Sequence, residues 1–236
     1  MIEEYKDYCV LKAFDLTNGQ IEKIKSLVDT DGVFLEISSL YKDSTIILIN
    51  KNESEVKFNE VLNMILSELK GFIYADNEMS LEECVVKKAI EKSVKIGVAE
   101  SLTGGMVCSS IVNVSGSSVV LHEGLVTYAT TAKVRRLHVK TSTLDKYGPA
   151  SKETCKEMVQ GVLENKEIKL ALATTGCAGP NSDEFDTPVG LAYIGVGDNK
   201  DIIVKEVMVD GNRETVRKTV TNIALYMLLN YIEKLN

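Results

Sequence analysis

Two short, almost wholly apolar runs constrain the fold of this chain more than any other feature. They are VKIGVA (94–99) and IKLALATT (168–175), and each has the length of a strand rather than a helix. A strand without polar alternation is buried on both faces, which is typical of a sheet covered by helices on both sides. Helix patterns follow or separate these runs, as in SKETCKEMVQGVLEN (151–165). We therefore predict an α/β domain of three layers, with helices, a sheet and helices.

The first third of the chain has a different pattern. Three strand patterns and two helix patterns alternate there, and they predict a small α+β unit that is complete by about Gly71. The strands are expected at 8–14, 34–41 and 44–50, and the helices at 17–28 and 53–69. The short acidic segment FIYADNEMS (72–80) is interpreted as the joint. The predicted domains are therefore residues 1–75 and 76–236.

Composition excludes several classes of function. The net charge of −7 argues against nucleic-acid binding, which needs a basic surface. The apolar runs are shorter than a membrane span, and the N-terminus lacks the apolar segment of a signal peptide, so we expect a cytoplasmic protein with no membrane contact. The five Cys show no CxxC spacing, which predicts reduced thiols and neither a disulfide framework nor a metal site.

The stretch VAESLTGGM (98–106) places a polar turn directly after a buried strand. In one interpretation Ser101 caps the next helix and the two glycines permit close packing. In the other, Ser101 is a nucleophile, and the backbone NH groups of residues 103–105 bind a phosphate or an oxyanion. A nucleophilic Ser needs a base. The chain has only two His, His122 and His138, which we expect in a strand and at a helix end, so Lys is the natural candidate.

Several motifs occur in an order that resembles one family. VAESLTGG is followed by GSS (116–118), GLVTYATTAKVRRLHV (124–139), TTGCAGP (174–180) and PVG (188–190). Over residues 80–235 the chain resembles the C-terminal domain of CinA, the nicotinamide-nucleotide amidohydrolase domain. Residues 8–79 resemble the KH-like linker domain of full-length CinA. The resemblance implies that the large N-terminal molybdopterin-binding-like domain, with its ADP-ribose pyrophosphatase activity, is absent. Because the linker is acidic and has no GxxG clamp, we expect no RNA binding.

The resemblance implies hydrolysis of the carboxamide of nicotinamide mononucleotide (NMN) to nicotinate mononucleotide and ammonia. Its catalytic residues would be Ser101 as nucleophile, Lys133 as base and Tyr128. Substrate contacts would come from a larger set, with Arg217 as the alternative to its last member: Glu100, Thr103, Gly104, Gly105, Thr175, Gly176, Gly179 and Arg213. The resemblance implies no cofactor and no metal, a small-molecule substrate, and a homo-oligomer.

Three departures from the family pattern bear on activity. Leu102, Cys177 and Thr187 stand where the family has Cys, Ile and Lys. They leave two alternatives open. One is a CinA-like protein without efficient catalysis that binds a partner linked to competence or recombination, and the other is an amidase acting on a related amide.

Overall fold

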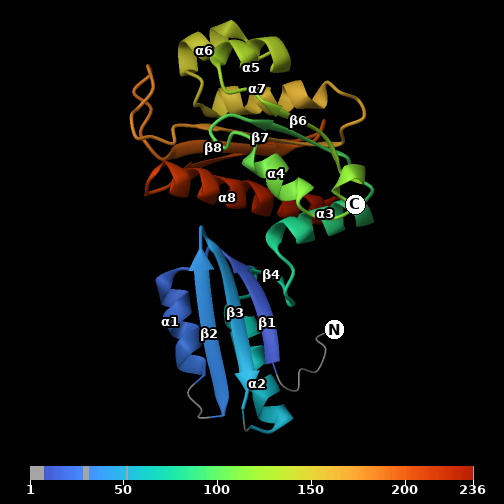
Figure 1. Ribbon diagram of the computed structural model, residues 1–236, viewed down its shortest axis with the longest axis vertical. Helices are drawn as coiled ribbons and strands as arrows, with labels where there is room; N and C mark the ends of the chain where they lie inside the picture. Colours follow the sequence, from blue (N-terminus) through green and yellow to red (C-terminus); the bar gives the residue numbers. More distant parts are fainter. Residues whose placement is uncertain (1–7, 29–31, 52, 236) are drawn as a thin grey trace. The chain divides into compact units, whose positions relative to one another are not determined.

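The computed structural model describes residues 8–28, 32–51 and 53–235. The chain forms two compact units, and the division falls between Ser80 and Leu81. Each unit has its own cluster of buried hydrophobic residues and is described by itself (Figure 1). In the part of the chain that the structure describes, no helix has the length and apolar character needed to cross a membrane.

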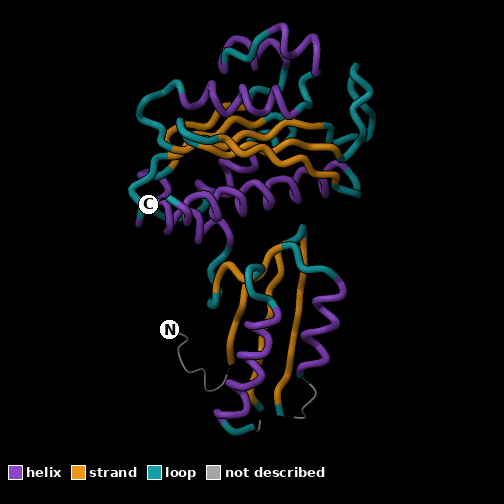
Figure 2. Tube along the Cα trace, turned by 180° about the vertical axis from the view of Figure 1, so that it is seen from behind, coloured by secondary structure: helices purple, strands orange, loops and turns teal. Residues whose placement is uncertain are grey.

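The first unit is an α+β domain built on an antiparallel sheet with strand order β2-β3-β1-β4. Helices α1 and α2 pack together over its core, as Figure 2 shows. Thr17 starts α1 through a capping box with Gln20, and Ser54 caps α2. The bounds are β1 (Tyr8–Phe14), α1 (Asn18–Leu27), β2 (Val33–Leu40), β3 (Asp43–Asn50), α2 (Glu55–Glu68) and β4 (Ile73–Ala75).

The end of this unit corrects the sequence prediction. We expected the unit to be complete at Gly71 and the joint to begin there. Instead, β4 pairs with β1, so residues up to Ala75 belong to the first sheet. The strand is three partly buried residues long, which is too short for a periodic pattern to reveal it.

The second unit is a three-layer α/β/α domain, which confirms the predicted fold class. Its sheet has the order β6-β5-β7-β8-β9, in which β6, β5 and β7 are parallel and β8 and β9 are antiparallel. The strands are β5 (Ile96–Glu100), β6 (Leu121–Val126), β7 (Leu170–Gly176), β8 (Leu191–Gly197) and β9 (Ile202–Met208).

Helices cover both faces of this sheet (Figure 1). On one face α7 packs against the strands, with α5 and α6 against α7; α3, α4 and α8 form the other layer. The helices are α3 (Leu81–Glu91), α4 (Met106–Val112), α5 (Thr130–Leu137), α6 (Thr141–Tyr147), α7 (Lys152–Leu163) and α8 (Arg213–Lys234). The sequence prediction did not include α6. A short 3₁₀ helix, Ser117–Val119, precedes β6.

The three parallel strands bring distant parts of the chain to one edge of the sheet. β5 ends at Glu100, β6 at Val126 and β7 at Gly176, and Glu100 lies opposite both Val126 and Thr174 in the sheet register. Ligand sites of open α/β sheets lie beyond the carboxyl ends of such strands. The fold therefore places the residues after position 100, after 126 and after 176 around a single site.

Candidate active site

A lysine and a serine that lie 32 positions apart in the sequence meet beyond the end of β5. Lys133 Nζ, in the first turn of α5, donates a hydrogen bond of 2.9 Å to Ser101 Oγ. The ammonium also donates to the carbonyl oxygens of Thr127, at 2.8 Å, and Tyr128, at 3.3 Å. Three acceptors thus hold the nitrogen in place. Lys133 is 1% exposed and Ser101 is 7% exposed.

Burial changes the acid–base chemistry of Lys133. Removing the ammonium from water disfavours its charged form, and this lowers the pKa of Lys133 from its ordinary value of 10.5 to about 8. The acceptors around it are a hydroxyl and two carbonyls, none of them an anion. Near neutral pH a fraction of the amine is therefore unprotonated and able to accept a proton from Ser101.

Glu100 has a structural role that differs from the substrate contact predicted for it. Its side chain is fully buried, and its carboxylate accepts hydrogen bonds from the backbone amides of Gly105, Val107 and Cys108 at 2.9, 3.1 and 2.9 Å. These amides begin α4, so Glu100 satisfies the helix N-terminus and stabilises its dipole. The alternative that Ser101 caps this helix is wrong, because the capping carboxylate comes from the residue before it.

The loop after Ser101 also corrects the predicted set of amide donors. Of the NH groups at positions 103–105, that of Gly104 donates to Ser101 O at 3.1 Å and that of Gly105 donates to Glu100. The amides of Leu102 and Thr103 have no acceptor among the residues that the structure describes. Gly104 and Gly105 have φ angles of +61° and +97°, a region that favours glycine, which explains the adjacent pair.

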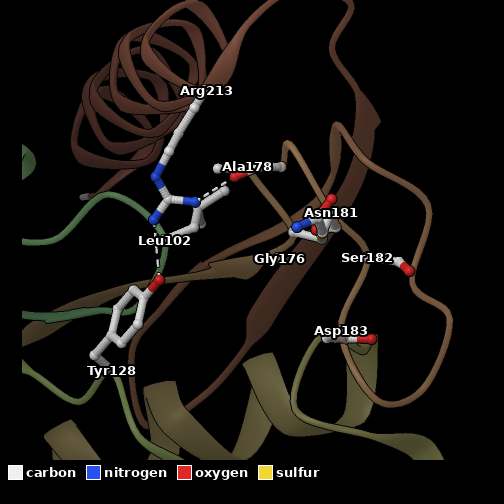
Figure 3. A pocket seen from close by; sticks show the side chains of 10 residues that line it. Leu102, Tyr128, Gly176, Ala178, Asn181, Ser182, Asp183 and Arg213 are labelled. Atoms are coloured by element: carbon white, nitrogen blue, oxygen red, sulfur yellow. Dashed lines mark hydrogen bonds between the residues drawn. The ribbon is translucent and has the colours of Figure 1, made fainter.

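A pocket of about 160 Å³ lies next to this loop (Figure 3). Arg213, the first residue of α8, donates from Nη1 to Gly179 O at 2.6 Å and from Nη2 to the Tyr128 hydroxyl at 3.0 Å. Ser101 and Lys133 are not lining residues; the pocket adjoins them through Leu102 and Tyr128. The lining residues are Leu102, Tyr128, Gly176, Cys177, Ala178, Gly179, Asn181, Ser182, Asp183 and Arg213.

The other predicted contact residues belong to the framework of the site. Thr175 is buried, and its hydroxyl donates to Pro149 O at 2.6 Å. Thr103 is also buried, and its hydroxyl shares a 2.7 Å hydrogen bond with that of Thr174. Arg217, the alternative to Arg213, donates to two backbone carbonyls and does not line the pocket. Tyr128, Gly176, Gly179 and Arg213 are thus the predicted residues that face the pocket.

Two of the departures from the family pattern make contacts within the loop between β7 and β8. Thr187 donates from its hydroxyl and its amide to the Asp183 carboxylate, at 2.8 and 3.0 Å, and the Phe185 amide joins them at 3.0 Å. The thiol of Cys177 donates to Asn181 O at 3.3 Å. Both substitutions therefore contribute to holding the loop that lines one side of the pocket. The third, Leu102, is buried and lines the pocket.

Thr127 is a site residue that the sequence analysis missed. Its amide donates to Glu100 O at 2.8 Å and its carbonyl accepts from Lys133, so its backbone links the two halves of the site. Its hydroxyl is buried and has no partner within the described part of the chain. The only sequence signal that could have identified Thr127 is its position, directly after an apolar strand and before Tyr128.

We expect Thr127→Val to stabilise the protein. Valine has nearly the same shape but lacks the buried hydroxyl, so the variant removes the cost of desolvating an unpaired polar group, about 1 kcal/mol. Urea denaturation of both proteins measures this change. Thr130→Val, at the partly exposed start of α5, is the matched control and should leave the free energy of unfolding within about 0.5 kcal/mol. A loss of stability in Thr127→Val would contradict the assignment of an unsatisfied hydroxyl.

Neither histidine contacts Ser101 or Lys133. His122 lies in β6, as predicted, 4.0 Å from Glu167. His138 lies at the end of α5, also as predicted, and has a φ of +54°. Its ring Nδ1 lies 2.6 Å from Glu164. Within the described ranges, no group of three or more His, Cys, Asp or Glu side chains is placed to hold a metal ion.

The sequence and the fold match known proteins over most of the chain. Residues 78–232 match the family model of the CinA C-terminal domain. A protein of Alkaliphilus metalliredigens named as a competence-damage inducible protein is 36% identical over 219 residues, which are 91% of this chain and 53% of the relative. A protein of Alkaliphilus oremlandii with the same name is 40% identical over 178 residues, which are 75% of this chain and 43% of that relative. The chain thus spans about half the length of these relatives.

Solved structures give the same answer for the second unit. The competence/damage inducible protein CihA from Agrobacterium tumefaciens has a TM-score of 0.60 at 32% identity, covering 64% of this chain and 99% of that one. The competence damage-inducible protein A from Klebsiella pneumoniae has a TM-score of 0.64 at 26% identity, covering 66% and 97%. By its sequence and by the fold of its second unit, the chain belongs to the CinA family.

Proposed function

We propose that this chain hydrolyses the carboxamide of NMN and releases nicotinate mononucleotide and ammonia. The observation that carries the proposal is the buried 2.9 Å contact between Lys133 Nζ and Ser101 Oγ, with a lysine pKa of about 8. A serine becomes nucleophilic when a neighbouring base accepts its proton. The CinA family, to which the resemblance assigns this deamidation, supports the choice of substrate.

The arrangement supports a two-step acyl transfer. Neutral Lys133 accepts the hydroxyl proton of Ser101 while Oγ attacks the carboxamide carbon. The amides of Leu102 and Thr103, which have no acceptor within the described chain, are the donors nearest in sequence to the nucleophile for the resulting oxyanion. Collapse of the tetrahedral intermediate breaks the C–N bond, and the leaving nitrogen takes the proton from Lys133. Water then hydrolyses the nicotinoyl ester on Ser101, with Lys133 as base again.

Arg213 supports a substrate that carries a phosphate. Its guanidinium lines the pocket, where Figure 3 shows it between the Tyr128 hydroxyl and the loop at Ala178. Two of its nitrogens already donate to neutral oxygens, of Gly179 and Tyr128. A guanidinium has five N–H donors in one plane, which suits bidentate binding of a phosphate. An anionic ligand would compete well with these neutral acceptors.

The direct test is incubation of the purified protein with NMN, measuring ammonia and nicotinate mononucleotide in parallel. We expect equal amounts of the two products. Turnover of other pyridine carboxamides without turnover of NMN would contradict the substrate assignment and favour an amidase for a related amide. No turnover of any carboxamide would contradict the enzymatic function and favour a partner-binding protein.

Replacing Arg213 should weaken substrate binding selectively. We expect Arg213→Gln to raise KM for NMN by about 10- to 100-fold, because a charge-assisted hydrogen bond contributes roughly 1.5–3 kcal/mol. KM for nicotinamide riboside, which has no phosphate, should change less than about threefold on the same estimate, since that hydrogen bond is not made. Steady-state kinetics with both substrates measure the difference. The control is Arg136→Gln, an exposed arginine in the last turn of α5. Equal rises for both substrates would contradict phosphate recognition by Arg213.

A further inference from the structure

Arg217 contacts the loop that follows the nucleophile rather than the pocket. It lies one turn beyond Arg213 on α8, and its guanidinium donates from Nε to Leu102 O at 2.9 Å and from Nη2 to Thr103 O at 2.8 Å. Both carbonyls belong to the two residues directly after Ser101. One rigid side chain thus holds two consecutive peptide groups, although it is 115 positions away from the first of them.

The planarity of the peptide bond turns this contact into control of an N–H direction. In a trans peptide, the carbonyl of one residue and the N–H of the next point in opposite directions. The Leu102–Thr103 peptide bond is trans, so the hydrogen bond from Arg217 Nε to Leu102 O directs the Thr103 N–H away from the guanidinium. Rotation of that peptide group would break the bond to Arg217.

The neighbouring peptide groups of the loop are held by other contacts. The Gly104 amide donates to Ser101 O, which fixes the peptide group before Leu102. The carbonyl of Thr103 accepts from the Met106 amide at 3.3 Å as well as from Arg217. The group between Leu102 and Thr103 differs, because within the described chain Arg217 is the residue that hydrogen-bonds to it.

From this geometry we infer that Arg217 is a positioning residue, which aims the Thr103 amide at the oxyanion formed when Ser101 attacks a carbonyl carbon. The inference rests on the proposed acyl transfer and names a residue that controls one of its donors. Gly104 supports it, since a Cβ at this position would lie 3.1 Å from Arg217 Nη2. The glycine thus leaves room for the guanidinium against the loop.

Kinetics of Arg217→Lys test the inference. A lysine is a single point donor and cannot hold both carbonyls in one plane. We expect kcat for NMN to fall by about 10- to 100-fold, less than the 10²–10³ for complete removal of an oxyanion donor. KM should stay within about twofold, because the residue does not line the pocket. The control is Lys218→Met, which replaces the neighbouring cation on α8. Lys218 pairs with Glu214 at 2.6 Å, so this variant should leave kcat unchanged. A rise in KM at unchanged kcat would overturn the inference.

A second measurement separates this inference from the choice of substrate. A fluorophosphonate reacts with Ser101 as Oγ bonds to phosphorus, the P–F bond breaks with its electron pair leaving on fluoride, and Lys133 takes the hydroxyl proton. The phosphoryl oxygen of the transition state needs the same amide donor. We expect Arg217→Lys to slow labelling about as much as it lowers kcat, with Lys218→Met unaffected. Labelling at the wild-type rate would overturn the inference.

Combining the two measurements distinguishes the possible failures. If the wild-type protein does not hydrolyse NMN but labelling is slower in Arg217→Lys, the proposed substrate is wrong and the role of Arg217 is supported. If Arg217→Lys does not fold, Arg217→Ala is labelled with and without methylguanidinium at millimolar concentration. If methylguanidinium accelerates labelling of Arg217→Ala but not labelling of wild type, the result supports a positioning role. No acceleration in a folded Arg217→Ala protein overturns it.

Discussion

Ser101→Ala is expected to lower kcat for NMN by about 10⁴-fold or more, the scale seen when the nucleophile of a serine hydrolase is removed. Without Oγ no acyl-enzyme forms, and Lys133 has no hydroxyl to deprotonate. Binding should survive, because Ser101 does not line the pocket. Ammonia release gives kcat, and titration calorimetry with NMN gives Kd, which should change less than about threefold since no charged contact to the ligand is lost.

Folding of Ser101→Ala should also be preserved. Lys133 Nζ keeps two of its three acceptors, the carbonyls of Thr127 and Tyr128, so one hydrogen bond is lost at a cost of about 1 kcal/mol. Ser109→Ala, an exposed serine on α4, is the matched control and should keep full activity. Ammonia release by Ser101→Ala at the wild-type rate would show that another residue attacks the amide, and would remove the basis of the proposed mechanism.

Much of the fold follows from local sequence signals. The buried strands β5 and β7 are apolar up to the polar residues at their carboxyl ends, and polar side chains mark helix starts at Thr17, Ser151 and Asn212. These signals agree with the tertiary structure, so the order of elements could be predicted. β4 and α6 were missed because they are short; α6 is seven residues long and buries only Thr143 and Leu144. So little apolar surface gives no periodicity to detect.

The site was less predictable, because its geometry depends on contacts between distant segments. Glu100 stands beside the nucleophile, and the resemblance to the family implied that it binds substrate. Only the fold shows that its carboxylate takes up the amides of α4. Arg213 and Arg217 are one helical turn apart, so the sequence could not choose between them. In the structure, Arg213 lines the pocket, and Arg217 reaches back to Leu102 and Thr103.

Lys133→Met is expected to remove activity and at the same time to change the pH dependence of stability. The wild-type kcat/KM should rise with pH and level off above about pH 8, because the base must be unprotonated and its pKa is about 8. Methionine has no proton acceptor, so kcat should fall by about 10³–10⁴-fold, as for a lost triad member. Initial rates across pH 6 to 10 measure both effects.

The stability of the two proteins should diverge with pH because folding lowers the pKa of Lys133. Between about pH 8 and 10.5 the unfolded chain binds more protons at this lysine than the folded chain does, so the free energy of unfolding rises with pH. Below pH 8 the lysine is charged in both states, and the buried charge destabilises the fold. The sign is therefore a gain in stability for wild type, relative to the methionine variant, as pH rises.

The magnitude follows from the same pKa values. The pKa of Lys133 is 10.5 in the unfolded chain and about 8 in the folded one. The free energy of unfolding of wild type minus that of Lys133→Met should therefore increase by about 2 kcal/mol from pH 7 to pH 9.5. Urea denaturation at the two pH values measures this difference, and it cancels all titrations that both proteins share. Lys140→Met, whose side chain is 74% exposed, is the control and should show no such gain. A constant difference between wild type and Lys133→Met would mean that Lys133 keeps an ordinary pKa in the folded protein. It would then stay protonated at neutral pH and could not serve as the base for Ser101.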